Sequence, residues 1–167
     1  NLFRFYDLGL QNNSNVIDIL DISTGMGYFP FIANVYGKSA ISTDTKNELY
    51  DKVTQALNVK KVDLRINGFQ AISPSFNGQK FDYITSFMIC FNGHKSPNLW
   101  SIQEWDYFLR DLSENLLTPD GTLALYFNLE EDGNPFSSEL NDYFLRLKGV
   151  ISGNKLILSK PLFKALV

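Results

Sequence analysis

Apolar runs and amphipathic segments alternate along the whole chain, and this alternation predicts strands and helices in turn. We expect strands at residues 16–22, 38–43, 62–66, 81–91, 122–128, 150–152 and 155–159. We expect helices at residues 28–36, 46–57, 101–117 and 137–147. Strands that alternate with helices favour a parallel sheet covered by helices on both faces. Gly153 and Asn154, between the last two strands, predict a two-residue hairpin turn and therefore one antiparallel strand.

The helix expected at residues 101–117 has the clearest pattern in the chain. One stripe of this helix carries Trp105, Phe108, Leu109, Leu112 and Leu116. Ser101 and Glu104 have the spacing of a capping box at its N-terminus. The strand at 81–91 is almost continuously apolar, which is typical of a parallel strand buried on both faces. Residues 118–121 are turn-forming types, so we expect a turn before the next strand.

The length and the rare residues limit the possible architectures. A chain of 167 residues fits one domain, residues 1–167, and no linker divides it. The sequence begins with Asn1 rather than Met, so we expect an N-terminally truncated chain. The single cysteine, Cys90, excludes an internal disulfide bond and a cysteine zinc cluster. The single histidine, His94, excludes a metal site with two histidines, so we expect no metal.

The charge balance makes nucleic acid an unfavourable partner. The chain has 15 basic and 18 acidic residues and a net charge of -3, which provides no overall attraction to phosphate groups. No apolar run approaches the roughly 20 residues of a membrane span. No charged and apolar leader typical of secretion begins the sequence. We therefore expect a cytoplasmic protein, and nothing in the sequence indicates its oligomeric state.

Small or polar residues gather where the predicted parallel strands end. The first strand runs into a turn that contains Gly25, Asp44 follows the second strand, and Asn67 follows the third. Ligands of such sheets bind beyond the carboxyl ends of the strands, so these residues predict a binding site at one edge. Glycine lets the backbone turn sharply and lets a ligand approach closely. Asp44 could accept hydrogen bonds from ribose hydroxyls, or it could cap the helix that begins near Lys46.

With these motifs the sequence resembles the class I S-adenosylmethionine-dependent methyltransferases over about residues 14–160. The segment at residues 21–27, Asp-Ile-Ser-Thr-Gly-Met-Gly, resembles the acidic-x-Gly-x-Gly-x-Gly motif of that family, with Ser23 in place of the first glycine. Residues 81–84 resemble the opening of the family's fourth strand, and residues 116–123 resemble its turn before the fifth. The resemblance implies a three-layer α/β/α sandwich with a mostly parallel seven-stranded sheet and an antiparallel C-terminal hairpin strand.

The same resemblance implies S-adenosylmethionine as cofactor and S-adenosylhomocysteine as product. The residues that would hold the methionine portion are Asp21, Ser23, Thr24, Gly25 and Gly27. The residue that would bind the ribose hydroxyls is Asp44. The residues that would flank the adenine are Asn67, Gly68 and Phe69. The residues that would border the sulfonium are Ser86, Phe87 and Met88.

Aromatic residues near the fourth strand suit a cationic ligand, because aromatic faces attract cations by about 0.5–2 kcal/mol. Phe87 and Phe91 are therefore either part of this site or ordinary core residues. Trp100 either packs against the helix that follows it or forms a wall of the acceptor pocket.

Methyl transfer from a sulfonium depends mainly on the alignment of the acceptor, the methyl group and the sulfur. His94, just after the fourth predicted strand, is the candidate general base; the alternative is an exposed loop histidine. Cys90 is interpreted as buried strand packing rather than a nucleophile. The acidic residues 130–132 could attract a cationic acceptor or form a solvated loop. Residues 91–94 replace the Asn/Asp-Pro-Pro-aromatic signature of amine-methylating relatives, which disfavours adenine or glutamine as acceptor.

We therefore expect a methyltransferase that acts on an oxygen or nitrogen of a small-molecule acceptor. The first alternative is a methyltransferase-like domain that binds the cofactor or a partner protein without turnover. A nicotinamide-dependent oxidoreductase fits less well, because its G-x-G-x-x-G pattern requires glycine where Pro30 stands.

Overall fold

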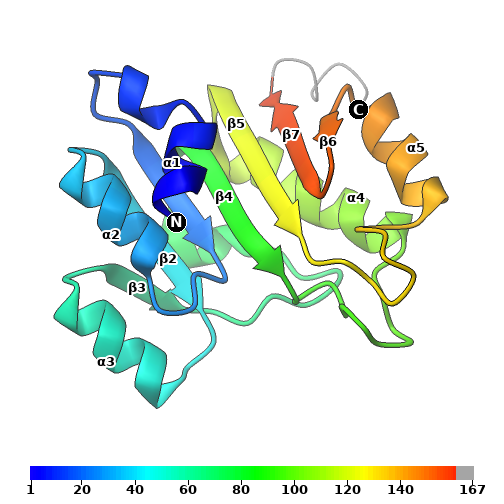
Figure 1. The fold of residues 1–167 in the computed structure, drawn as a ribbon, viewed down its shortest axis with the longest axis horizontal. Coiled ribbons are helices and arrows are strands. Elements are labelled where there is room, and N and C mark those ends of the chain that lie inside the picture. The colour runs from blue at the N-terminus through cyan, green and yellow to red at the C-terminus, as the bar shows by residue number, and fades with distance from the viewer. Residues whose placement is uncertain (161–167) are drawn as a thin grey trace.

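One mixed β-sheet forms the centre of the computed structural model, which describes residues 1–160 (Figure 1). Its strands are β1 (Asp18–Ile22), β2 (Ser39–Asp44), β3 (Lys60–Asp63), β4 (Phe81–Ile89), β5 (Leu117–Phe127), β6 (Val150–Ser152) and β7 (Lys155–Ser159). They lie in the order β3-β2-β1-β4-β5-β7-β6. The first five strands pair in parallel, and β7 runs antiparallel to both β5 and β6. The seven-stranded sheet with an antiparallel hairpin strand is therefore confirmed.

Helices cover both faces of this sheet (Figure 1). They are α1 (Leu2–Asp7), α2 (Tyr28–Val35), α3 (Glu48–Ala56), α4 (Ile102–Asp111) and α5 (Ser138–Arg146). On one face, Phe5 of α1 and Phe29 of α2 share an apolar cluster with residues of β1, β2 and β4. On the other face, Trp105 of α4 and Phe144 of α5 belong to the larger cluster. The three-layer α/β/α arrangement follows from these two clusters.

The expected stripe and capping box are both present in α4. Ser101 is the N-cap, and its backbone N–H donates to the Glu104 carboxylate across 2.8 Å. Trp105 and Phe108 are buried against the sheet. Beyond Asp111 the helix continues as a π-helical turn, Leu112–Leu116. None of the helices in residues 1–160 has the length and apolar character needed to cross a membrane.

The third and fifth strands have other bounds than the sequence predicts. The third strand is Lys60–Asp63 rather than 62–66, because β3 is an edge strand where polar residues such as lysine are tolerated. Residues 118–121 do not form a turn that precedes the fifth strand. They lie inside β5 as an irregularity, because Phe81 pairs with Leu117 while Tyr83 already pairs with Thr122.

Candidate functional site

A cleft of about 1190 Å³ opens at the edge of the sheet where the parallel strands end. Four segments line it: residues 23–25 after β1, 44–46 at the end of β2, 64–68 after β3, and the end of β4 with the loop that follows. Tyr50 of α3 completes the wall on the β2 side. The edge at which the sequence predicts a binding site therefore has a cleft, built from segments far apart in the sequence.

Backbone hydrogen bonds, within the turn and to β2, hold the turn after β1 in place. Thr24 donates its N–H to the carbonyl of Thr43 on β2 across 3.0 Å, and Gly27 donates to the carbonyl of Thr24. Ser23 and Gly25 both have positive φ, 57° and 61°. Left-handed backbone favours glycine, so the family's usual glycine at the position of Ser23 has a conformational reason. Serine occupies this conformation here at some cost in stability.

The glycines of this turn have different surroundings. A Cβ built on Gly25 would meet nothing within 4 Å, and Gly25 lines the cleft. A Cβ on Gly27 would lie 2.8 Å from Cγ2 of Thr54 on α3. Gly25 therefore leaves room for a ligand, whereas Gly27 permits the close packing of α2 against α3 and does not line the cleft.

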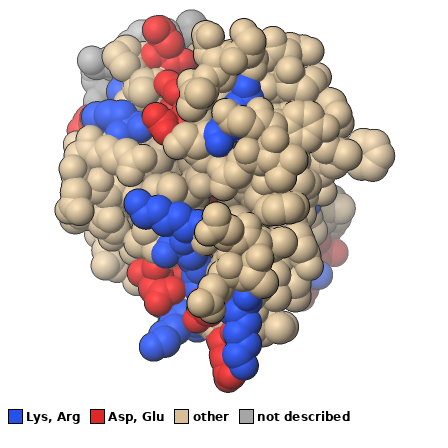
Figure 2. Space-filling model, turned by 90° about the vertical axis from the view of Figure 1, so that its left-hand side faces the viewer, with Lys and Arg blue, Asp and Glu red and all other residues tan. Residues whose placement is uncertain are grey.

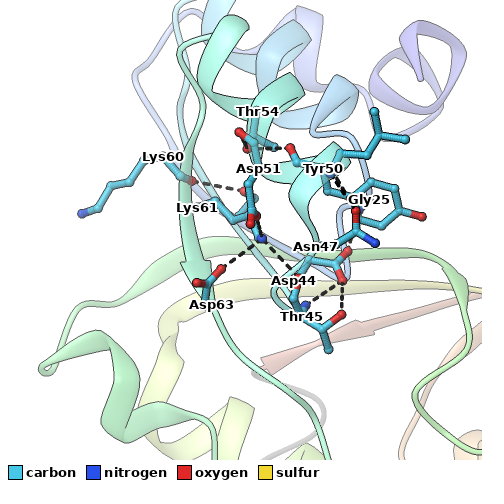
Figure 3. A network of polar contacts seen from close by, with 12 residues as sticks. Gly25, Asp44, Thr45, Asn47, Tyr50, Asp51, Thr54, Lys60, Lys61 and Asp63 are labelled. Carbon is cyan, nitrogen blue, oxygen red and sulfur yellow. Dashed lines mark hydrogen bonds and ion pairs between the residues drawn. The ribbon is translucent and has the colours of Figure 1, made fainter.

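Asp44 connects the ends of β1 and β2 (Figure 3). Its Oδ2 accepts a hydrogen bond from the N–H of Gly25, and its Oδ1 accepts one from the N–H of Thr45, each across 2.7 Å. The interpretation of Asp44 as a helix cap is wrong. Asn47 caps α3, and its side chain accepts from the N–H groups of Leu49 and Tyr50.

Lys61 fixes the segment that carries Asp44. Its ammonium group donates to the carbonyl of Thr45 across 3.2 Å and pairs with Asp51 of α3 and Asp63 of β3 (Figure 3). Burial lowers the pKa of Lys61, but the two carboxylates outweigh it and hold that pKa above its usual value. The ammonium therefore stays charged and ties β3, α3 and the rim of the cleft together.

Asp21 lies beneath the turn rather than in the cleft, with 1% of its surface exposed. It accepts hydrogen bonds from the hydroxyls of Thr24 and Thr85, across 2.6 and 2.7 Å. Burial raises the pKa of this carboxyl to about 6, although the two hydroxyl donors oppose the shift. Asp21 is thus placed to support the turn from below.

The residues expected to flank an adenine separate into two groups. Asn67 and Gly68 line the cleft, and Gly68 packs so closely that an added Cβ would lie 2.8 Å from Cγ of Glu104. Phe69 does not line it. The residue is 58% exposed, and its ring makes an edge contact with Tyr107, with the ring centroids 6.1 Å apart.

The residues at the end of β4 that were expected to border the sulfonium do not all line the cleft. Phe87 and Met88 line the cleft, but Ser86 is buried and donates its hydroxyl to the carbonyl of Ile22. Phe87 packs against Tyr126 and also carries the guanidinium of Arg4 at 4.7 Å from its ring centroid. The attraction of this ring for a cation is therefore already met in part by the protein itself.

The loop after β4 forms the far wall of the cleft through Phe91, Gly93 and Trp100. Trp100 packs against Trp105 of α4, as one of its two interpretations expects, and it also lines the cleft. Cys90 lines the cleft and is exposed, so the interpretation as buried packing is wrong. The strand ends at Ile89, one residue too early to bury it.

His94 is held by Glu130 rather than free in solvent. Its Nδ1 lies 2.9 Å from Oε1 of Glu130, and the other carboxylate oxygen accepts from the N–H of Lys95. Burial raises the pKa of Glu130, but the hydrogen bonds from His94 and Lys95 prevail and keep it below the usual value. Gly93 lines the cleft, but the His94 side chain is not part of its wall. Glu130 lines a second cavity of about 520 Å³.

Sequence reasoning missed several residues of the wall: Thr45, Lys46, Tyr50, Leu64, Arg65, Ile66 and Asn98. Most of them directly follow β2 or β3. The rule that ligands lie beyond strand ends would have found these neighbours if it had been applied to whole segments.

Protein-family models and curated proteins give no match to the sequence. Solved structures of low identity do match the fold. A TehB-like SAM-dependent methyltransferase from Corynebacterium glutamicum is 18% identical, with a TM-score of 0.55 over 95% of this chain and 93% of that chain. The protein PH0226 from Pyrococcus horikoshii is 18% identical, with a TM-score of 0.56 over 88% of this chain.

The glycopeptide N-methyltransferase MtfA, solved with S-adenosyl-L-methionine, is 11% identical, with a TM-score of 0.54 over 93% of this chain. This chain spans 64% of the length of MtfA and 57% of the length of PH0226. Identities this low establish the fold alone. Together with the strand order, they show that the chain has the fold of the class I methyltransferases.

Proposed function

We propose that the cleft binds S-adenosylmethionine and that the protein transfers its methyl group to an oxygen or nitrogen of a small-molecule acceptor. The observation that carries this proposal is the junction of Gly25 and Asp44. It places an open glycine surface beside a carboxylate at the carboxyl ends of adjacent parallel strands, where nucleosides bind in such folds.

The residues present fit an adenosyl ligand. The open space over Gly25 admits a ligand against the backbone. The Asp44 carboxylate uses part of its acceptor capacity on Gly25 and Thr45, and its remaining lone pairs suit ribose hydroxyls. Asn67 and Gly68 form the wall where the adenine is expected. When bound, the sulfonium supplies an activated methyl group.

The chain's own residues would then align the acceptor and exclude water. Phe91 and Trp100 offer apolar walls on the β4 side of the cleft, and Phe87 and Met88 border the expected position of the sulfonium. Because Nδ1 of His94 faces Glu130, its Nε2 is the atom left to accept a proton from the acceptor. This role of His94 requires its side chain to reach the cleft when an acceptor is bound.

A small-molecule acceptor is favoured over nucleic acid. On the face shown in Figure 2, Lys and Arg side chains lie interspersed with Asp and Glu, mainly in the lower part around α3. Mixed charges of this kind do not form the basic stripe that tracks a phosphate backbone. The overall charge of -3 supports the same conclusion.

Two measurements test the proposal in sequence. Calorimetric titration with S-adenosylhomocysteine should give binding at a single site. A methyl-release assay with labelled S-adenosylmethionine over a panel of hydroxyl and amine acceptors should then give turnover with at least one of them. Binding without turnover across the panel would favour a cofactor-binding module. Fluorescence titration with reduced nicotinamide nucleotide tests the oxidoreductase alternative, and we expect no binding.

A further inference from the structure

The outer side of α2 is apolar although it faces solvent. Tyr28, Phe31, Ile32 and Val35 recur at the spacing of one helical stripe. Tyr28 is 46% exposed and Val35 is 66% exposed, while Phe31 and Ile32 between them are half-buried. The buried Phe29 belongs to the side that packs on the sheet. Apolar residues therefore occupy both sides of α2, a pattern typical of a helix that is covered all round.

The sequence of α2, Tyr-Phe-Pro-Phe-Ile-Ala-Asn-Val, contains no charged residue. Its one amide side chain, that of Asn34, is engaged with the N–H and the carbonyl of Ala40 on β2, across 2.7 and 3.3 Å. The helix α3 has the usual pattern of a solvent-facing helix, because it exposes Glu48 and Lys52. The outer side of α2 thus has the composition of a covered surface.

The helix α1 extends this apolar surface. The two helices lie side by side on one face of the sheet (Figure 1), and the hydroxyls of Tyr6 and Tyr36 lie 2.8 Å apart. Helical spacing places Leu2 and Phe3 beside Tyr6, and Phe3 is 89% exposed. The exposed apolar residues of the two helices form what we call the α1–α2 patch: Leu2, Phe3, Tyr6, Tyr28, Val35 and Tyr36.

The charged residues of α1 are engaged with the sheet rather than with this patch. The guanidinium of Arg4 lies 4.7 Å from the centroid of the Phe87 ring on β4. Asp7 accepts hydrogen bonds from the hydroxyl of Tyr126 on β5 and, across 2.9 Å, from Lys155 on β7. A surface depleted of charge and rich in tyrosine and phenylalanine is typical of the centre of a protein–protein interface.

The patch is large enough for a stable interface. The exposed fractions of its six members, with about 200 Å² for a large side chain, give roughly 600 Å² of mostly apolar surface. The largest apolar patch on a typical monomer has at most about this size and is often functional. A standard interface covers about 800 Å² on each partner, of which about 60% is apolar. The patch and a narrow rim around it supply this area.

A second copy of the same chain is the occupant that this composition favours. An uncharged surface meets its own copy without repulsion between like charges. A two-fold axis brings the same surface together from both copies, and this is the commonest symmetry of protein assemblies. Helices that lie on a membrane surface carry Lys and Arg instead, which α2 lacks. The net charge of -3 also provides no attraction to anionic lipid.

We propose that two copies of this chain form a homodimer through their α1–α2 patches, related by a two-fold axis. Phe3 and Val35, the most exposed members of the patch, become buried in this interface. The inference goes beyond the proposed function and needs no ligand. It explains why the outer side of α2 is built from apolar residues.

Sedimentation equilibrium of the intact chain between about 1 and 100 µM tests this proposal, because interfaces of this size reach micromolar affinity or better. The average mass of the wild type should rise to that of two chains within this range. Hydrogen exchange of the wild type, compared at the two ends of the range, should slow in α1 and α2. It should stay unchanged in α5, which covers the other face of the sheet.

Two variants and a matched control identify the surface. Val35→Glu places like charges in the interface and Phe3→Ser removes its most exposed ring, so each should weaken the dimer by about tenfold or more. Leu145→Glu is the control, because it places the same charge on an exposed leucine of α5 and should leave the dimer unchanged. Circular dichroism and urea denaturation verify that each variant is folded.

The outcomes decide the proposal without reference to a ligand. A wild type that stays monomeric throughout the range overturns it. So does a monomer that co-sediments with phosphatidylcholine vesicles, because the patch then takes lipid. A dimer that both variants retain, that Leu145→Glu disrupts equally, or whose slowed exchange lies outside α1 and α2 overturns it as well. None of these results bears on S-adenosylmethionine binding, which is measured separately.

Discussion

The carboxylate of Asp44 accepts a hydrogen bond from the backbone N–H of Gly25 across 2.7 Å. This contact joins the turn after β1 to the end of β2, and both residues line the cleft. Under the proposed function the same carboxylate would also bind the ribose hydroxyls.

Asp44→Ala should therefore weaken the binding of S-adenosylhomocysteine by about 1.5–3 kcal/mol, the range for a lost hydrogen bond to a charged group. Calorimetry measures this directly. Asp120→Ala is the control, because Asp120 is an exposed carboxylate in the irregular segment of β5. Unchanged affinity in a folded Asp44→Ala variant would remove Asp44 from the binding site.

Ser23→Gly should stabilise the protein. Ser23 has a φ of 57°, and glycine adopts this region without the clash of a Cβ. We expect the free energy of unfolding to rise by about 0.5–1 kcal/mol, because the greater entropy of glycine in the unfolded chain offsets part of the gain. Urea denaturation measures the change. Ser39→Gly, in the extended strand β2, should destabilise instead. A loss of stability in Ser23→Gly contradicts the account of this turn.

Gly27→Ala should mainly reduce folding stability, whereas Gly25→Ala should mainly weaken ligand binding. An alanine at position 27 would press on Thr54, so it should cost about 1–3 kcal/mol more in folding stability than one at position 25. An alanine at position 25 meets no protein atom but occupies the cleft, so it should weaken S-adenosylhomocysteine binding more than its effect on stability explains. Denaturation and calorimetry on both variants separate these effects. Equal losses of stability would show that Thr54 yields to the added methyl group.

The buried carboxyl of Asp21 predicts a pH dependence of stability. Its pKa in the folded protein is raised from 3.8 to about 6, chiefly by burial. Below about pH 4 the group is protonated in both states, and its stabilising contribution is complete. As the pH rises from about 4 through about 6, Asp21 loses its proton in the unfolded state before it does so in the folded state. The free energy of unfolding therefore falls by about 3 kcal/mol.

Asp21→Asn isolates this effect from the other carboxyls. Denaturation of both proteins between pH 4 and pH 7 should show the wild type losing stability relative to the variant as the pH rises. Asp7 and Glu104 have lowered pKa values and act with the opposite sign at lower pH, but they are common to both proteins. A constant difference across this range would mean that Asp21 titrates normally.

The sequence predicted the sheet and the position of the cleft because both follow from local pattern and a general rule of parallel sheets. Gly25 and Asp44 could be placed together because adjacent parallel strands end at one edge. The helix α4 could also be predicted from the sequence, since it has an apolar stripe and a capping box at its start. These features need no knowledge of distant contacts.

Other features depend on contacts that pattern does not reveal. Position 27 favours glycine because a Cβ there would press on Thr54, a residue of another helix. The helix α1 lacks a clean apolar stripe, because Phe3 is 89% exposed while Phe5 is buried. Phe69 was assigned to the site from its neighbours, but its left-handed backbone, with a φ of 57°, accompanies a ring that lies outside the cleft wall.

A crystal structure of this chain grown with S-adenosylhomocysteine tests the central claim most directly. The account predicts that the ribose hydroxyls lie within hydrogen-bonding distance of the Asp44 carboxylate and that the ligand passes over Gly25. Density for the ligand at any other surface, or none in this cleft at saturating concentration, would contradict it.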